Sequence, residues 1–286
     1  MTRPPYILAM PDSRSTATIF ASPHSGCDYP RRFVSDSVLT ETTLRSSEDA
    51  FVDRLFDRAP QFGAPLLTAV MPRAYVDLNR SAEELDPALI EGVRQFGHNP
   101  RISSGLGVVP RVVSNGKSIR HGRISMQEAR ERLDRFYHPY HDCLHRLMGE
   151  SHAMFGSALL FDCHSMPKDA LLATSNAFVK TPDIVLGDRF GTSCDAGIAA
   201  LVEGVFKDAG LVVSRNLPFA GAFVVQNYGR PSMGRHVMQI EINRALYMDE
   251  ATITPNAGFG DLKAVIDRIV AHLADLGRDE LKLAAE

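Results

Sequence analysis

The run Ala158-Leu159-Leu160-Phe161-Asp162-Cys163 is apolar except for one aspartate, and it decides the fold class. A short apolar run of this kind is typical of a strand that is covered on both faces, as in parallel sheets. Further β-prone runs stand at 16–21, 65–70, 211–213 and 237–242. Helical periodicity lies between these runs, so the chain is expected to be α/β, with a mixed, mainly parallel sheet flanked by helices. No internal repeat or long linker divides residues 1–286, which predicts a single domain.

Several helices are predicted from their end signals. Ser125 opens the clearest one, because Glu128 completes a capping box, and Pro139 is expected to kink or interrupt it. A second helix is expected to follow Ser46, and others to run from about 192 to 209 and from about 261 to the C-terminus. The polar, Gly- and Pro-rich stretch from 81 to about 122 is long for a loop, so it is expected to carry function.

Composition excludes several classes of protein. Lys and Arg number 31 against 34 Asp and Glu, so there is no basic surplus for binding nucleic acid. Apolar residues make up 44%, which argues against disorder, and no apolar run approaches the roughly 18 residues of a membrane span. The four cysteines are widely scattered without a CxxC pair, which favours a reducing cytoplasm over a disulfide framework or a Cys-rich zinc site.

Polar residues follow two of the predicted strands. His24 comes shortly after the run 16–21, and His164 directly follows the run 158–163. Ligands of open α/β sheets bind beyond the carboxyl ends of the strands, and imidazole is a good zinc ligand. Either histidine alone would more often be a hydrogen-bonded structural residue. Two histidines at equivalent strand ends favour a metal site.

Two other segments carry candidate functional groups. Alternation along 239–243 places Gln239, Glu241 and Asn243 on one face of a strand. A glutamate in such a strand is costly unless it is paired, protonated or near a metal, so Glu241 is the strongest candidate for a general base. In the segment 75–80, Asn79 and Arg80 offer an amide and a planar fork suited to a carboxylate, although a solvated strand end would look the same.

Six segments together resemble the N-formylglutamate amidohydrolase (deformylase) family. They span about residues 20–250 and occur in the family's order. The segments are Pro23–Pro30, Tyr75–Arg80, Asp162–Pro167, Asp183–Arg189, Tyr228–Pro231 and the residues around Glu241. This family is related to zinc carboxypeptidases and aspartoacylase-like deacylases. The resemblance therefore implies a phosphorylase/hydrolase-like, zinc-carboxypeptidase-like fold that binds Zn²⁺ or another divalent metal.

The resemblance also implies residue roles. His24 and His164 match the two histidine ligands of the metal, and Asp77 matches the carboxylate that orients a ligand histidine. Asn79 and Arg80 match the pair that holds a substrate carboxylate. Glu241 matches the glutamate that activates water, and that role agrees with its place in the strand.

The remaining metal ligand is left open by the sequence. Carboxypeptidases place a glutamate three residues after the first histidine, and here that position is Cys27. An acidic residue recurs in the formylglutamate family near Glu48 and Asp49, and alignment by eye favours Asp49. Both acids could instead merely offset the dipole of a helix that begins there, and a Cys27 thiolate is a third choice.

The expected activity is metal-dependent deformylation of N-formyl-L-glutamate to formate and L-glutamate, as in histidine breakdown. Arg80 would bind one carboxylate of this small-molecule substrate, and Arg230 in the Gly-Arg-Pro segment is the candidate for the other. Two alternatives remain: a related metal-dependent deacylase of another N-acyl amino acid or peptide, and a catalytically silent binding homologue. No nucleic-acid or membrane partner is expected, and the oligomeric state is not determined by the sequence.

Overall fold

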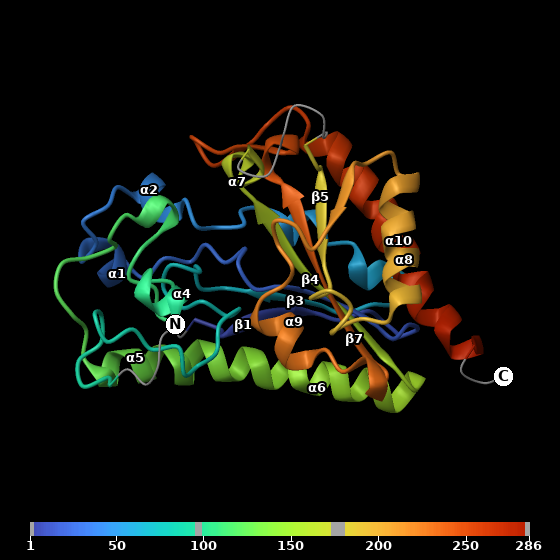
Figure 1. Ribbon diagram of the computed structural model, residues 1–286, viewed down its shortest axis with the longest axis horizontal. Coiled ribbons are helices and arrows are strands. Elements are labelled where there is room, and N and C mark those ends of the chain that lie inside the picture. The colour runs from blue at the N-terminus through green and yellow to red at the C-terminus, as the bar shows by residue number, and fades with distance from the viewer. Residues whose placement is uncertain (1–2, 95–98, 173–180, 284–286) are drawn as a thin grey trace.

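A seven-stranded sheet forms the centre of the computed structural model, which describes residues 3–94, 99–172 and 181–283 (Figure 1). In spatial order its strands are β1 (Tyr6–Ala9), β3 (Leu66–Ala69), β2 (Thr18–Ser22), β4 (Ala158–Met166), β7 (Arg235–Asn243), β5 (Ile184–Gly187) and β6 (Val213–Arg215). Strands β3, β2, β4 and β7 run parallel, whereas β1 is antiparallel to β3 and β5 is antiparallel to β7. The predicted mixed, mainly parallel sheet is confirmed.

Helices cover both faces of this sheet. On one face, α8 (Ala196–Asp208) and α10 (Phe259–Leu283) pack over Phe161 and Ile240. On the other face, α6 (His138–Phe155) packs over Leu160 and Val237 (Figure 1). Because side chains alternate along a strand, Asp162, His164, Gln239 and Glu241 point to the same face as Leu160 and Val237. Beyond the cover of α6, that face carries the polar site.

The other elements are short and connect the strands. The helices are α1 (Arg31–Ser35), α2 (Glu41–Arg45), α3 (Val52–Leu55), α4 (Pro100–Ser103), α5 (Met126–Arg132), α7 (Lys168–Leu172) and α9 (Phe223–Tyr228). A separate two-stranded ladder joins β8 (Met248–Asp249) to β9 (Thr254–Pro255). Within the described residues, no helix combines the length and the apolar character needed to cross a membrane.

The prediction that a helix begins directly after Ser46 is wrong. Ser46 ends α2, and α3 begins only at Val52, after Phe51 has adopted a left-handed backbone with φ of 67°. The chain between the two helices is therefore a turn, which places Asp49 outside any helix. A left-handed phenylalanine is uncommon because its Cβ crowds the backbone, so the reversal at this position could not be anticipated from helix periodicity.

The predicted start of a helix at Ser125 is correct: α5 begins at the next residue, and the Ser125 hydroxyl accepts a hydrogen bond from the amide of Glu128 at 3.1 Å. Pro139 does interrupt the helix that follows: a π-helical turn over Leu133–Tyr137 separates α5 from α6. Proline lacks the amide hydrogen that a regular α-helix needs, and a π turn accommodates its ring. Between 81 and 122 the described residues form little regular structure beyond α4 and the 3₁₀ turn Ser114–Gly116.

Candidate active site

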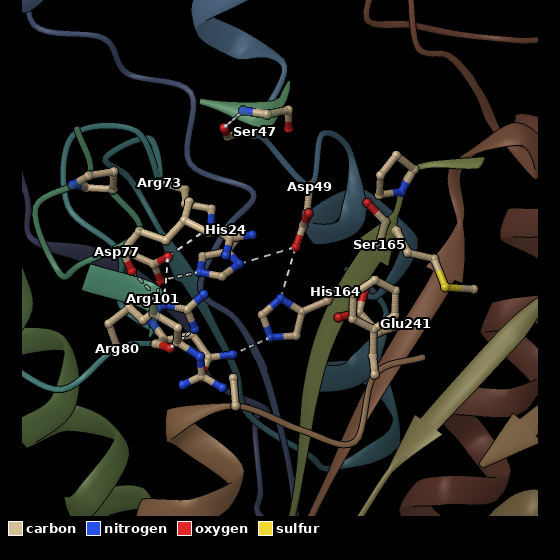
Figure 2. A pocket seen from close by; sticks show the side chains of 18 of the residues that line it. His24, Ser47, Asp49, Arg73, Asp77, Arg80, Arg101, His164, Ser165 and Glu241 are labelled. Carbon is tan, nitrogen blue, oxygen red and sulfur yellow. Dashed lines mark hydrogen bonds and ion pairs between the residues drawn. The ribbon is translucent and has the colours of Figure 1, made fainter. Parts of the chain in front are cut away.

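Two histidines and one aspartate meet at the polar end of the sheet (Figure 2). His24 follows β2, His164 lies on β4, and Asp49 comes from the turn before α3. Asp49 Oδ2 lies 2.9 Å from His164 Nδ1 and 3.4 Å from His24 Nδ1. One potential ligand atom from each residue lies within 4.8 Å of the others, and all three side chains are buried. Imidazole and carboxylate at this spacing suit a divalent transition metal.

A carboxylate orients each histidine ring. Asp77 Oδ1 accepts a hydrogen bond from His24 Nε2 at 2.8 Å, and Asp162 Oδ2 lies 2.9 Å from His164 Nε2. A proton on Nε2 leaves Nδ1 free to coordinate, which is the usual arrangement of metal-bound histidines. The Nδ1 atom of His24 is buried and has no hydrogen-bond partner among the described residues. Such a buried, unpartnered nitrogen fits a metal ligand.

Charges inside the cluster shift its pKa values strongly. Burial disfavours the Asp49 carboxylate, but its close contacts with the His164 and His24 rings hold its pKa well below the ordinary value. Burial likewise opposes ionisation of Asp77, and the neighbouring Arg73 holds its pKa well below the usual range. Burial alone would lower the pKa of His164, whereas the Asp162 charge raises it well above the ordinary value. A metal that binds here must therefore displace a proton from His164.

Glu241 lies beside this cluster. It pairs in register with His164 across β4 and β7, so both side chains stand next to each other on the same face. Gln239 Nε2 donates a hydrogen bond to Glu241 Oε1 at 2.8 Å. Burial raises the pKa of Glu241 to about 7, against the opposing charge of His164. A carboxylate with this pKa can both accept and return a proton near neutral pH.

The predicted substrate-binding pair lies in the same pocket, which has a volume of about 700 Å³. Asn79 Oδ1 accepts a hydrogen bond from the amide of Val224 at 2.7 Å. Arg80 donates through Nε to the carbonyl of Leu106 and through Nη1 to the carbonyl of Asn79. Both side chains are buried and held in place by the backbone. They therefore present fixed polar groups to a ligand in the pocket.

The three candidates for the remaining ligand lie in different surroundings. Glu48 forms an ion pair with Arg45 at 2.9 Å and lies outside the cluster. Cys27 is exposed, is not among the residues that line the pocket, and has a thiol pKa raised by partial burial. Only Asp49 is brought next to both histidines among the described residues.

Arg230 does not lie in the pocket, contrary to expectation. Its Nη1 donates to the carbonyl of Gln226 at 2.9 Å, and the residue lines a second surface hollow, which Arg189 borders together with the main pocket. The Gly-Arg-Pro segment follows α9 and bridges back to β7 at Arg235. That path directs Arg230 away from the pocket that His24 and Glu241 line.

Three functional neighbours were not predicted. Arg244 Nη2 donates to Asp49 Oδ1 at 2.9 Å, Arg73 Nε donates to Asp77 Oδ2 at 3.0 Å, and Asp162 supports His164. Asp162 had a sequence signal, because an acidic residue inside an apolar strand needs a partner. The two arginines had none, since their contacts depend on how distant segments pack.

Comparison with known proteins shows the family of the chain. The family model for N-formylglutamate amidohydrolase matches residues 16–248. An N-formylglutamate deformylase of Pseudomonas aeruginosa is 30% identical over 269 residues, which are 91% of this chain and 94% of the relative. A Pseudomonas putida protein of the same name is 29% identical over 235 residues, covering 81% of this chain and 82% of its own.

Solved structures give the same result. The crystal structure of N-formylglutamate amidohydrolase from Ralstonia eutropha matches with a TM-score of 0.90 and 34% identity, over 96% of this chain and 99% of that one. A gene product of Agrobacterium tumefaciens, at 17% identity and a TM-score of 0.66 over 98% of this chain and 96% of its own, shares the fold. By sequence and by structure, the chain belongs to the N-formylglutamate amidohydrolase family.

Proposed function

We propose that this protein is a metal-dependent deformylase that hydrolyses N-formyl-L-glutamate to formate and L-glutamate. The observation that carries the proposal is the buried cluster of His24, Asp49 and His164 next to Glu241. The names of the Pseudomonas relatives support the choice of substrate. Zn²⁺ is the proposed metal, because two imidazoles and one carboxylate are a common ligand set of catalytic zinc sites.

The residues present fit such a metal. His24 Nδ1, Asp49 Oδ2 and His164 Nδ1 would hold it, and Asp77 and Asp162 would fix the two rings. Three protein ligands leave a coordination position for water or substrate. When bound, the cation lowers the pKa of water and polarises a carbonyl oxygen.

The protein's own groups would then perform the proton transfers. Glu241 accepts a proton from the attacking water while the water oxygen bonds to the formyl carbon. The carbon–nitrogen bond breaks, and Glu241 returns the proton to the leaving amine. Asn79 and Arg80 would hold a substrate carboxylate, which orients the formyl group. Products are formate and the free amino acid.

A substrate panel tests this proposal. The purified protein, loaded with Zn²⁺, is assayed against N-formyl and N-acetyl amino acids, with N-formyl-L-glutamate expected to give the highest kcat/KM. A chelator should abolish turnover, and added zinc should restore it. A higher kcat/KM for another N-acyl amino acid would reassign the substrate. A protein that neither binds zinc nor turns over any of these compounds would be a binding homologue, and the proposal would be wrong.

A further inference from the structure

The turn after β5, residues 188–191, has an unusual backbone conformation that several hydrogen bonds fix. Arg189 and Phe190 are consecutive left-handed residues, with φ of 51° and 57°. Asp188 Oδ1 accepts a hydrogen bond from the amide of Gly191 at 3.1 Å. Asn216 Oδ1 accepts from the amides of Asp188 and Phe190 at 3.1 and 3.2 Å. Left-handed side-chain-bearing residues persist only where surrounding contacts fix them, and they concentrate at functional sites.

This turn is also tied to the catalytic strand. The amide of Arg189 donates to the carbonyl of Ala220 at 2.7 Å. Gly187 allows that approach, since a Cβ at this position would lie 2.7 Å from the carbonyl carbon of Ala220. Two residues on, the amide of Ala222 donates to Gln239, whose side chain in turn holds Glu241. The position of Arg189 is therefore fixed relative to the proposed base.

The Arg189 side chain lines the pocket and is only half-buried. Within the described residues, its one side-chain hydrogen bond is a long one, 3.5 Å from Nη1 to the carbonyl of Gly221. No carboxylate lies within ion-pair distance of it in the described parts of the chain. By contrast, Arg73 and Arg244 are engaged by Asp77 and Asp49. Arg189 thus offers a guanidinium on a fixed backbone, with no ion pair to any residue that the structure describes.

The charge balance of the pocket favours an anionic ligand. Among the residues that the structure describes, five arginines line it: Arg73, Arg80, Arg101, Arg189 and Arg244. Against these stand three carboxylates: Asp49, Asp77 and Glu241. A bound divalent cation would add to the positive excess. A substrate with two carboxylates would compensate this excess better than one with a single carboxylate.

We propose that Arg189 binds the side-chain carboxylate of the substrate and thereby selects N-formyl derivatives of acidic amino acids. The planar guanidinium matches a carboxylate with two parallel hydrogen bonds. The fixed backbone of the turn reduces the entropy lost when the ligand binds. Arg80 remains available for the α-carboxylate. This inference rests on the proposed function and assigns to Arg189 the role that was expected of Arg230.

The test compares two substrates that differ in one group. N-formyl-L-norvaline lacks the side-chain carboxylate of N-formyl-L-glutamate. The preference is the kcat/KM for N-formyl-L-glutamate divided by the kcat/KM for N-formyl-L-norvaline. Arg189→Met should lower this preference by about 10- to 100-fold, which corresponds to the free energy of charge-assisted hydrogen bonds. Turnover of the norvaline compound should fall much less than that of the glutamate compound, and circular dichroism should show that the variant is folded. Arg189→Lys should keep part of the preference, and Arg130→Met, on the exposed side of α5, serves as the control for losing an arginine.

A binding measurement separates this inference from the proposed function. In a Glu241→Gln background, calorimetry compares the affinities of the two compounds with and without Arg189→Met. If the wild-type protein turns over neither compound, the proposed function fails, and the binding difference still decides the role of Arg189. An unchanged preference in Arg189→Met, in both turnover and binding, would overturn the inference. A loss of preference in Arg230→Met instead would also overturn it.

Discussion

Replacing Glu241 by glutamine is expected to make the metal-free protein more stable at alkaline pH while removing its proposed activity. Burial raises the pKa of this carboxyl from 4.5 to about 7, so the folded protein holds an ionised Glu241 at a cost. Glutamine has nearly the same shape, and its Oε1 can still accept the hydrogen bond from Gln239. The substitution therefore removes a buried charge without leaving a cavity.

The sign and size of the effect follow from the two pKa values. Between pH 4.5 and 7 the folded protein binds this proton more tightly than the unfolded chain, so the contribution of Glu241 to the free energy of unfolding falls as pH rises. The full cost is reached above pH 7 and amounts to about 3 kcal/mol, at roughly 1.4 kcal/mol per tenfold change in proton affinity. Glu241→Gln should thus gain about 3 kcal/mol over wild type at pH 8 and little at pH 4.

Urea denaturation of metal-free protein, with a chelator present, at pH 4, 6 and 8 measures this difference. The exposed Glu83→Gln is the matched control, because it removes a carboxylate that is already in water. In zinc-loaded protein, kcat of Glu241→Gln should fall by about 10²- to 10⁴-fold with metal content unchanged. A stability difference that is independent of pH, or a variant less stable than wild type at pH 8, would refute the argument that burial sets this pKa.

Three further predictions concern the metal and the substrate. His24→Ala and His164→Ala should each lose bound zinc, measured by elemental analysis after dialysis, while circular dichroism still reports a folded protein; full zinc occupancy in either variant would exclude that ligand. Asp49→Asn should weaken zinc binding in a chelator competition, whereas Asp53→Asn on α3 should not, and equal affinities would rule out Asp49. Arg80→Lys should lower kcat/KM for N-formyl-L-glutamate several-fold, because an ammonium group lacks the planar fork; an unchanged value would remove Arg80 from substrate binding.

Much of the fold was predictable because the central strands are continuous apolar runs in the sequence. The apolar runs 158–163 and 237–242 became β4 and β7, which are paired at the middle of the sheet. The histidines at strand ends and the glutamate in an alternating strand could also be identified as candidates, because a buried polar group costs free energy unless it has a partner. Strand β5 was not predicted, because only four of its residues pair, and its antiparallel direction relative to β7 is a tertiary property.

The parts of the site that the local sequence did not determine depend on how distant segments pack. Glu48 and Asp49 are neighbours in the turn before α3, and the local sequence alone does not choose between them. One carboxylate then pairs with Arg45 and the other joins the histidines. Arg189 could not be identified either, because its place in the pocket depends on the contact between the turn after β5 and Ala220. Local sequence specifies such turns weakly, since distant packing decides them.

The pairing of His164 with Glu241 across β4 and β7 has a consequence for how this enzyme can diverge. A ladder of nine residue pairs fixes the two strands, so the proposed metal ligand and the proposed base are held next to each other by one backbone pairing. Arg101 and Arg189 stand on connecting segments outside that ladder. Connecting segments tolerate exchange and insertion far better than central strands do. New acyl-amino-acid specificities can therefore arise by replacing these segments alone, and directed evolution toward other acids is best aimed at residues 99–106 and 188–191.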